Sequence, residues 1–334
     1  MSNQPPIEVP QGAIRLNTDS QRLEFFAQDR WYEFATNTQV LDGGVGRGIA
    51  AGGNTPGQSN VLEFITISTA GDSTDFGDLT VARQSNPSAH GNSTRGVVAG
   101  GQIHPANSNI IDFITFSSTG NASDFGDLPQ ARRNLIGNGN QTRGIFAGGQ
   151  TPTVVNTIEY ITMSQTGNAV DFGDLTTVRK QLGGTASSPT RSLFPGGSTP
   201  SDSDVIDFIT IPTLGNAADF GDLTVARIET KGVSSSTRAC MMSGYVSPAN
   251  LNIIDFVTIA TKGDARDFGD LTETISVAQS ASNSVRGVRM GGITPLDVSM
   301  DYITIATRGD AVFFGDLLST HKEGAGMSNA HGGL

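Results

Sequence analysis

The fold is decided by the stretch Thr213-Leu214-Gly215-Asn216-Ala217-Ala218-Asp219-Phe220-Gly221-Asp222-Leu223-Thr224-Val225-Ala226-Arg227, because close copies of it occur six times in 334 residues. Each copy contains a core of the form Phe-Gly-Asp-Leu. The phenylalanine of this core falls at Phe76, Phe125, Phe172, Phe220, Phe268 and Phe314, so the intervals are 49, 47, 48, 48 and 46 residues. The chain therefore contains six repeats of nearly constant length.

A second marker repeats in the same register. It is an arginine that opens a segment such as Arg-Gly-Val-Val-Ala-Gly-Gly, and it occurs at Arg47, Arg95, Arg143, Arg191, Arg238 and Arg286, with spacings of 48, 48, 48, 47 and 48 residues. Two markers that keep step indicate that each repeat is one folding unit. A period of about 40 to 50 residues with short strands and Gly-Gly pairs predicts the blades of a β-propeller.

Each repeat carries signals for four short strands. A Gly followed by Asn or Asp separates an apolar strand, such as residues 110–116, from the Asp-Phe-Gly-Asp-Leu strand, and this pair suits a two-residue type II′ turn. The apolar strands have hydrophobic residues on both faces, so each sheet must lie between two neighbours. The Arg-to-Gly-Gly segment supplies another strand, and the small side chains of residues 134–140 suit an inner strand at a crowded axis. We therefore predict an all-β, six-bladed propeller over residues 37–334.

Composition and charge narrow the classes of function. The net charge is -11, with 32 acidic and 21 basic residues and no basic cluster, so neither nucleic-acid binding nor docking onto an anionic bilayer is expected. No segment has 18 consecutive apolar residues and no signal-peptide pattern opens the chain, so membrane insertion is not expected. Cys240 is the only cysteine, which excludes an intramolecular disulfide and predicts a small buried thiol.

Residues 1–36 stand outside the repeat. Residues 13–17, 22–26 and 30–34 read as three short strands, with a turn at residues 18–21 between the first two. A sheet this small is barely stable alone. We therefore expect it to pack on the ring, on copies of itself in a homo-oligomer, or on another protein.

Two segments compete for the inner strand of the first blade. Residues 321–332 match the inner-strand region of the other repeats, whereas residues 37–46 lie just before the first repeat. We expect the C-terminal segment to close the ring.

The N-terminal residues Gly12-Ala13-Ile14-Arg15-Leu16-Asn17-Thr18-Asp19, followed by Leu23-Glu24 and Trp31, resemble a hairpin module found near the start of phage virion and tail-fibre proteins. The repeats resemble a divergent kelch motif, with Phe-Gly-Asp-Leu where a kelch repeat places Trp-x-x-Leu. They are also similar to a repeat family of phages of marine cyanobacteria. These resemblances imply a virion protein of the tail or capsid surface, in which residues 1–36 bind other virion proteins.

Two charged positions occur in all six repeats, and we expect them to form hydrogen-bonded pairs that tie strands or adjacent blades. They are the arginines named above and Asp78, Asp127, Asp174, Asp222, Asp270 and Asp316. Calcium binding by these carboxylates is an alternative, although no Asp-x-Asp-x-Asp-Gly loop is present. Asp-Phe-Gly without a phosphate loop does not indicate a kinase. The four histidines lack metal-site spacing and are expected in solvated loops. No catalytic residue, metal or cofactor is predicted.

The loops after each Gly-Gly pair differ most between repeats and should share one face of the ring. Their polar residues suit recognition of glycans or protein surfaces, with passive connections as the alternative. The candidate binding residues are Asn54, Gln102, His104, Gln150, Asp202, Tyr245, Asn250 and Asp297. The predicted function is a non-enzymatic, tail-associated virion protein, trimeric if it forms a fibre, that contacts a host-surface glycan or protein. The alternatives are a capsid decoration protein and a glycan-cleaving propeller enzyme.

Overall fold

The computed structural model describes residues 10, 12–17, 22–27, 30–33, 46–54, 56–184, 186–293 and 296–334. Its elements are all β-strands, and the chain divides into two units, Met1–Leu41 and Asp42–Leu334. The boundary that we predicted at residue 36 falls among residues 34–45, which lie outside the described part.

The smaller unit is a three-stranded antiparallel sheet. It consists of β1 (Ile14–Asn17), β2 (Arg22–Ala27) and β3 (Arg30–Glu33), in the order β1-β2-β3. The Arg15 guanidinium lies 4.1 Å from the centroid of the Trp31 ring, and Phe26 contacts the same ring edge-on. The three predicted strands are present, and the turn predicted at residues 18–21 lies outside the described residues.

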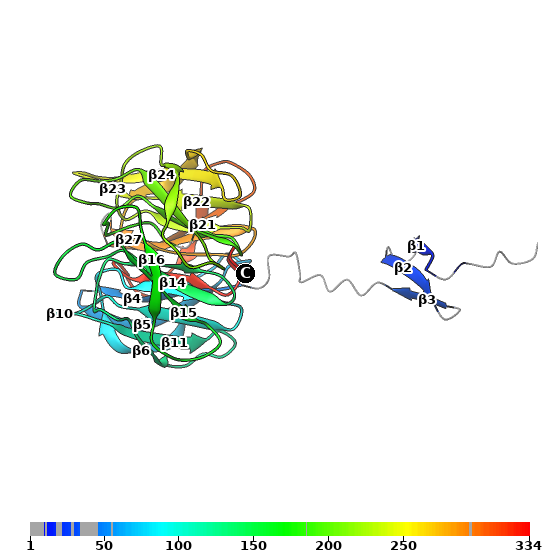
Figure 1. Cartoon of the computed structure of the whole chain (residues 1–334), viewed down its shortest axis with the longest axis horizontal. Coiled ribbons are helices and arrows are strands. Elements are labelled where there is room, and N and C mark those ends of the chain that lie inside the picture. Colours follow the sequence, from blue (N-terminus) through cyan, green and yellow to red (C-terminus); the bar gives the residue numbers. More distant parts are fainter. Residues whose placement is uncertain are drawn as a thin grey trace, which may run out of the picture. The chain divides into compact units, whose positions relative to one another are not determined.

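The larger unit is a six-bladed β-propeller of four-stranded antiparallel sheets, as predicted (Figure 1). From inner to outer strand, blade 1 contains β30 (Ala325–Ser328), β4 (Arg47–Asn54), β5 (Gln58–Thr66) and β6 (Thr74–Arg83). Blade 2 contains β7 (Ser88–Gly91), β8 (Arg95–Ala99), β11 (Ile110–Thr115) and β12 (Ser123–Asp127). Blade 3 contains β13 (Ile136–Gly139), β14 (Arg143–Ala147), β15 (Thr157–Thr162) and β16 (Val170–Asp174).

The other three blades repeat this order. Blade 4 contains β17 (Ala186–Ser187), β18 (Arg191–Pro195), β19 (Val205–Thr210) and β20 (Ala218–Asp222). Blade 5 contains β21 (Lys231–Ser234), β22 (Arg238–Met242), β24 (Ala249–Thr258) and β25 (Arg266–Ile275), with the short β23 (Tyr245–Val246) beside β24. Blade 6 contains β26 (Gln279–Ser282), β27 (Arg286–Ile293), β28 (Leu296–Thr304) and β29 (Val312–Asp316). In blade 2, a small hairpin of β9 (Gln102–Ile103) and β10 (Ala106–Asn107) lies between β8 and β11.

The ring is closed by the C-terminal segment. β30 pairs antiparallel with β4, with Ala325 opposite Ala51 and Ser328 opposite Gly48. The inner strand of blade 1 therefore comes from the C-terminal segment, which confirms the expected closure of the ring by residues 321–332. The competing residues 37–46 lie outside the described part, apart from Gly46.

The hydrophobic core consists of six clusters, one between each pair of neighbouring blades. In the first cluster, Ile49 and Phe76 of blade 1 pack with Val98 and Phe116 of blade 2, and all four are buried. Both faces of each sheet are therefore covered, as the apolar strands predicted. Burial of this apolar area is the main driving force for closing the ring.

The Gly-Asn and Gly-Asp pairs do not form two-residue hairpin turns. They lie in longer connections, such as the one between β11 and β12, and bind the outer strand of the preceding blade. Gly120 donates its N–H to Phe76 O at 2.7 Å, and Asp78 donates its N–H to Asn121 Oδ1 at 3.1 Å. A Cβ on Gly77 would lie 2.5 Å from Gly120 O, which explains the glycine of Phe-Gly-Asp. The type II′ prediction was wrong because contact with the next blade sets this backbone.

Candidate functional site

The arginine that opens each second strand joins neighbouring blades. Arg47 lies over the Phe64 ring of its own blade at 4.9 Å and donates from Nη1 to Phe116 O of the next blade at 2.7 Å. The other five repeats use Arg95, Arg143, Arg191, Arg238 and Arg286 in the same way. These arginines thus stack on an aromatic ring of their own blade and tie it to the next blade through a carbonyl group.

The repeated aspartates are not the partners of these arginines. Among the described residues, no ion pair joins the two sets. Each aspartate instead donates its backbone N–H to the Asn or Asp side chain of the next blade, and its own carboxylate is at least partly exposed. The residues concerned are Asp78, Asp127, Asp174, Asp222, Asp270 and Asp316. The predicted pairing was wrong because the guanidinium group stacks on an aromatic ring and points to the next blade.

A different arginine forms the buried ion pairs. Arg83, at the end of β6, pairs with Asp112 of β11 in the next blade, and both side chains are fully buried. Thr80 Oγ1 donates to the same carboxylate at 2.6 Å. Equivalent pairs join Arg132 with Glu159, Arg179 with Asp207, and Arg227 with Asp255. These acidic partners were not predicted, although an acidic residue occupies the same place in every apolar strand.

The last two repeats lack this arginine and replace it in two ways. Ile275 stands in its place in blade 5, and Arg289 of β27 pairs instead with Asp301, directly opposite on β28, at 2.6 Å. His321 stands in its place at the end of blade 6 and lies 2.9 Å from Glu63 of blade 1. Each of the six buried carboxylates therefore retains a nitrogen partner.

One end of the central channel is closed by the residues after β30. His331 Nε2 donates to Gly91 O of β7 at 2.6 Å, and Gly332 donates to Ser234 O of β21 at 2.9 Å. These strands belong to blades 2 and 5, which are opposite each other in a ring of six. The segment thus crosses the axis.

Two buried histidines meet at this closed end. The rings of His90 and His331 are 5.1 Å apart, and burial lowers the pKa of His90 to about 3 and that of His331 to about 4. His321 is buried as well, and only His104 is exposed. The expectation of four solvated histidines was therefore wrong for three. His321 replaces the arginine of a buried pair, and His90 and His331 form hydrogen bonds with backbone carbonyl groups in the interior.

The other end of the channel opens into a cavity of about 640 Å³. Its rim comes from the connections that lead into the inner strands, together with loops of blades 3, 5 and 6. The lining includes Ser85, Asn86, Arg133, Asn134, Gln150, Lys180, Gln181, Ile228, Glu229, Tyr245, Pro248, Asn250, Ser276, Val277, Ile293 and Glu323. We call this cavity the open mouth. Its volume is in the range of small-molecule sites.

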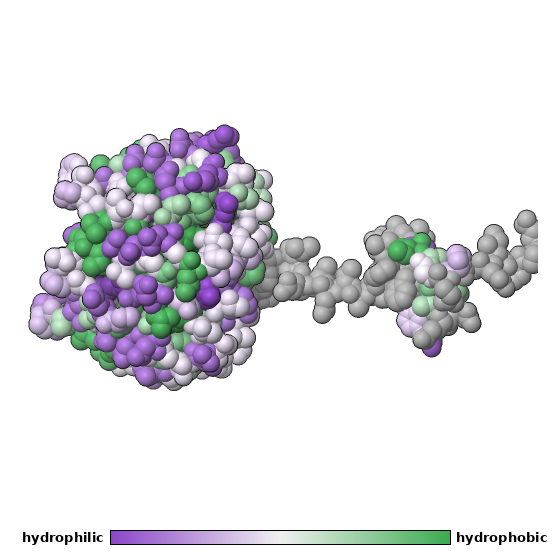
Figure 2. All heavy atoms as spheres, viewed as in Figure 1, coloured by the Kyte–Doolittle hydropathy of each residue, from purple (hydrophilic) through white to green (hydrophobic). Residues whose placement is uncertain are grey.

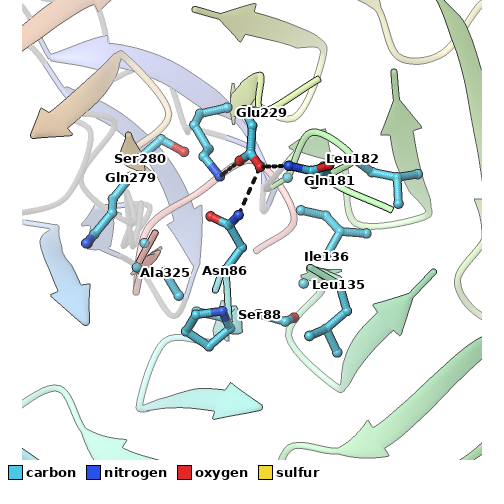
Figure 3. Close-up of a pocket in the computed structure, with 17 residues that line it drawn as sticks. Asn86, Ser88, Leu135, Ile136, Gln181, Leu182, Glu229, Gln279, Ser280 and Ala325 are labelled. Atoms are coloured by element: carbon cyan, nitrogen blue, oxygen red, sulfur yellow. Dashed lines mark hydrogen bonds and ion pairs between the residues drawn. The ribbon is translucent and has the colours of Figure 1, made fainter. Parts of the chain in front are cut away.

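Glu229 lies on the floor of the open mouth and also lines a smaller pocket inside the channel, which Figure 3 shows. Its Oε1 accepts hydrogen bonds from Gln181 Nε2 at 2.6 Å and Asn86 Nδ2 at 3.0 Å, and its Oε2 lies 3.8 Å from Lys231 Nζ. Burial raises the pKa of Glu229 and lowers that of Lys231. Asn86 Oδ1 is buried and has no hydrogen-bond partner. The floor thus offers one unused acceptor.

The backbone holds the side chains of this floor in place. Asn86, Asn134, Gln181, Glu229, Val277 and Glu323 occupy one equivalent position per repeat, and each has a φ between 50° and 60°. Several are joined by backbone hydrogen bonds, such as Gln181 N–H to Asn134 O at 3.0 Å. The left-handed conformation of all six directs one side chain per repeat to the axis.

The open mouth contains three of the eight predicted binding residues. These are Gln150, Tyr245 and Asn250. Asn54 and Gln102 do not line it, because Asn54 donates to Gln84 Oε1 at 2.9 Å and Gln102 is paired with the Gln84 backbone.

The remaining three predicted residues also lie outside the cavity lining. His104 is exposed in the loop after β9, and Asp202 is half-buried and bridges to Ser198. Asp297 pairs with Arg289 at 3.3 Å and so supports the buried ion pair. Arg133, Lys180, Glu229 and Glu323 line the open mouth and were not predicted.

Within the described residues, no group of three His, Cys, Asp or Glu side chains could hold a metal ion. None of the described elements is a helix long and apolar enough to cross a membrane. Cys240 is buried in β22, and burial raises the pKa of its thiol to about 12. No family model matches the chain, and no curated protein matches it.

Proposed function

We propose that this chain is a non-enzymatic virion protein that binds a host-surface glycan in the open mouth and attaches to the particle through residues 1–36. The observation that carries the binding role is the open mouth itself. It combines amide side chains, charged groups and one aromatic ring, Tyr245, in a cavity of about 640 Å³. Saccharides present hydroxyl groups and apolar ring faces, which amides and an aromatic ring can bind together.

The asymmetry of the channel supports a single site. One end is filled by residues 331–334, whereas the other is an open cavity. On the propeller face seen in Figure 2, hydrophobic residues are scattered in small groups among polar ones. This side of the ring therefore shows no broad apolar surface.

The role on a virion rests on the resemblance of residues 12–31 to phage hairpin modules. The small sheet leaves large side chains accessible, since Ile14 is 64% exposed. Attachment to another protein or to copies of itself, as in a trimeric fibre, would cover them.

Binding is tested with purified full-length protein on an array of surface glycans. We expect binding that Tyr245→Ala weakens and His104→Ala leaves unchanged, because only Tyr245 lines the open mouth. Both variants should melt like the parent protein. Binding that is insensitive to Tyr245→Ala would contradict the proposed site, and antibody labelling of particles on the head rather than the tail would favour a decoration protein.

A glycan-cleaving enzyme is the second candidate, because Glu229 and Glu323 line the same cavity and the pKa of Glu229 is raised by burial. Glycosidases use two carboxyl groups, one of which must be protonated. Against this role, both oxygens of Glu229 already face Gln181, Asn86 or Lys231. Release of reducing ends by the parent protein and its loss in Glu229→Gln would establish the enzyme.

A further inference from the structure

Two cations stand next to each other on the rim of the open mouth. The residue that follows the Val-Ala-Arg position is Gln84, Arg133, Lys180, Ile228, Ser276 or Lys322 in the six repeats. Arg133 and Lys180 come from consecutive repeats and both line the cavity, whereas Lys322 does not. Ring closure therefore concentrates positive charge on one side of the mouth, in a chain whose net charge is -11.

These cations have little compensation within the protein. Among the described residues, the Arg133 guanidinium makes no ion pair or hydrogen bond. The polar contact of Lys180 Nζ is with Gln150 Oε1 at 3.5 Å, the limit of a hydrogen bond. A guanidinium group at a cavity wall can bind a carboxylate through two parallel hydrogen bonds. This side of the mouth thus suits an anionic group.

The two carboxylates of the mouth are placed differently: Glu229 lies on the floor beside Gln181, the residue after Lys180, whereas Glu323 lies across the ring from Lys180. Glu229 is bound by Gln181 and Asn86 on the floor and lies near Lys231. Glu323 precedes β30 in blade 1, and Lys180 precedes β17 in blade 4, so these residues belong to opposite positions of the ring. Glu323 can accept hydrogen bonds from hydroxyl groups. The cavity therefore has a cationic side and an acceptor side.

We infer that the ligand of the open mouth is a saccharide that carries a carboxylate, with its acid group at Arg133 and Lys180 and its hydroxyl groups toward Glu323 and Asn250. This inference rests on the proposed glycan-binding function and names its substrate class. Tyr245 supplies the apolar contact with the sugar ring. A volume of about 640 Å³ admits a ligand of one or two sugar units.

The test uses full-length protein and calorimetric titration with four acidic saccharides, the oligomers of glucuronate, galacturonate and mannuronate and a sialylated disaccharide, each beside its methyl ester. At least one acid should bind roughly 10-fold to 100-fold more tightly than its ester, the range for a charge-assisted hydrogen bond. Arg133→Gln and Lys180→Gln should remove most of that difference without changing the melting temperature. Lys322→Gln is the matched control, because it removes a cation from the equivalent position outside the cavity.

Other outcomes overturn the inference in distinguishable ways. Equal binding of acid and ester that still depends on Tyr245 would leave a neutral glycan site and refute the carboxylate. Inorganic phosphate that competes as well as the saccharides would show a bare anion site. If no acid or ester in the panel binds, the inference is refuted. If no glycan on the wider array binds either, the proposed function is refuted as well.

Discussion

Arg289 shows how one residue is replaced without losing the interaction that it makes. Four blades supply a buried guanidinium from the end of the outer strand, whereas blade 6 supplies it from β27, because Ile275 occupies the usual place. The carboxylate of Asp301 is buried like its counterparts. Removing one partner of a buried pair leaves an uncompensated buried charge. The stability lost in this way is larger than the net stability that the intact pair contributes.

We predict that Arg289→Met lowers the free energy of unfolding by about 3–5 kcal/mol. Adding Ile275→Arg should restore most of this loss, because an arginine in that place reaches the acidic residue in four other repeats. Urea unfolding of the parent, the single variants and the double variant measures both effects. A double variant no more stable than Arg289→Met would show that the two sites are not equivalent.

Single residues also mark what could be predicted from the sequence. The Arg residues that open the second strands recur at constant spacing, which predicted a tie between strands or blades, but the predicted aspartate partners were wrong. The carbonyl groups that they bind leave no sequence signal. The buried histidines were missed because each occurs once, and a residue that occurs once gives no periodicity to interpret.

At the scale of elements, β30 determines whether the ring is closed. It supplies the inner strand of blade 1, and Met327 packs between blades 1 and 2. Without it, β4 would lose the backbone hydrogen bonds of one edge and the first interblade cluster would be open to water.

Deletion of residues 321–334 should therefore lower the melting temperature strongly or abolish cooperative unfolding. Deletion of residues 332–334 alone is the control, since it retains β30 and removes only part of the closed end. Differential scanning calorimetry measures both. An unchanged unfolding transition in the variant that lacks residues 321–334 would contradict ring closure by the C-terminal segment.

The segment after β30 should make stability depend on pH. His331 donates to Gly91 O and accepts from Gly333 N–H, so its neutral form satisfies both ring nitrogens. Burial lowers the folded-state pKa of His331 to about 4 and that of His90 to about 3, from 6.5. The unfolded chain thus binds more protons below pH 6.5, and the stability present above that pH is lost as the pH falls toward 4 for His331 and toward 3 for His90.

We expect the denaturant concentration at the unfolding midpoint to decrease as the pH is lowered from about 6.5 to about 4. The decrease should be smaller in His331→Gln. The glutamine variant should be less stable at pH 7, where the neutral imidazole makes both bonds. His104→Gln, at an exposed position, serves as the control. An equal slope in the parent and His331→Gln would show that this histidine does not titrate on unfolding.

At the scale of the whole molecule, the repeat builds the ring and the departures from it build the site. The fold was predictable because six matching units allow few arrangements that bury both faces of every sheet. The open mouth was predicted only in part. Gln150, Tyr245 and Asn250 lie in variable loops, whereas Arg133, Lys180 and Glu323 come to line one cavity only when the ring closes. Comparing the residue after each Val-Ala-Arg position would have revealed the two adjacent cations.

The most direct test of the account is a crystal structure of the full-length protein with the tightest-binding acidic saccharide. We predict that the sugar lies in the open mouth, with its carboxylate at Arg133 and Lys180 and its ring against Tyr245. A sugar bound on the outer strands or at the closed end near His331, with the open mouth holding only water, would contradict the account.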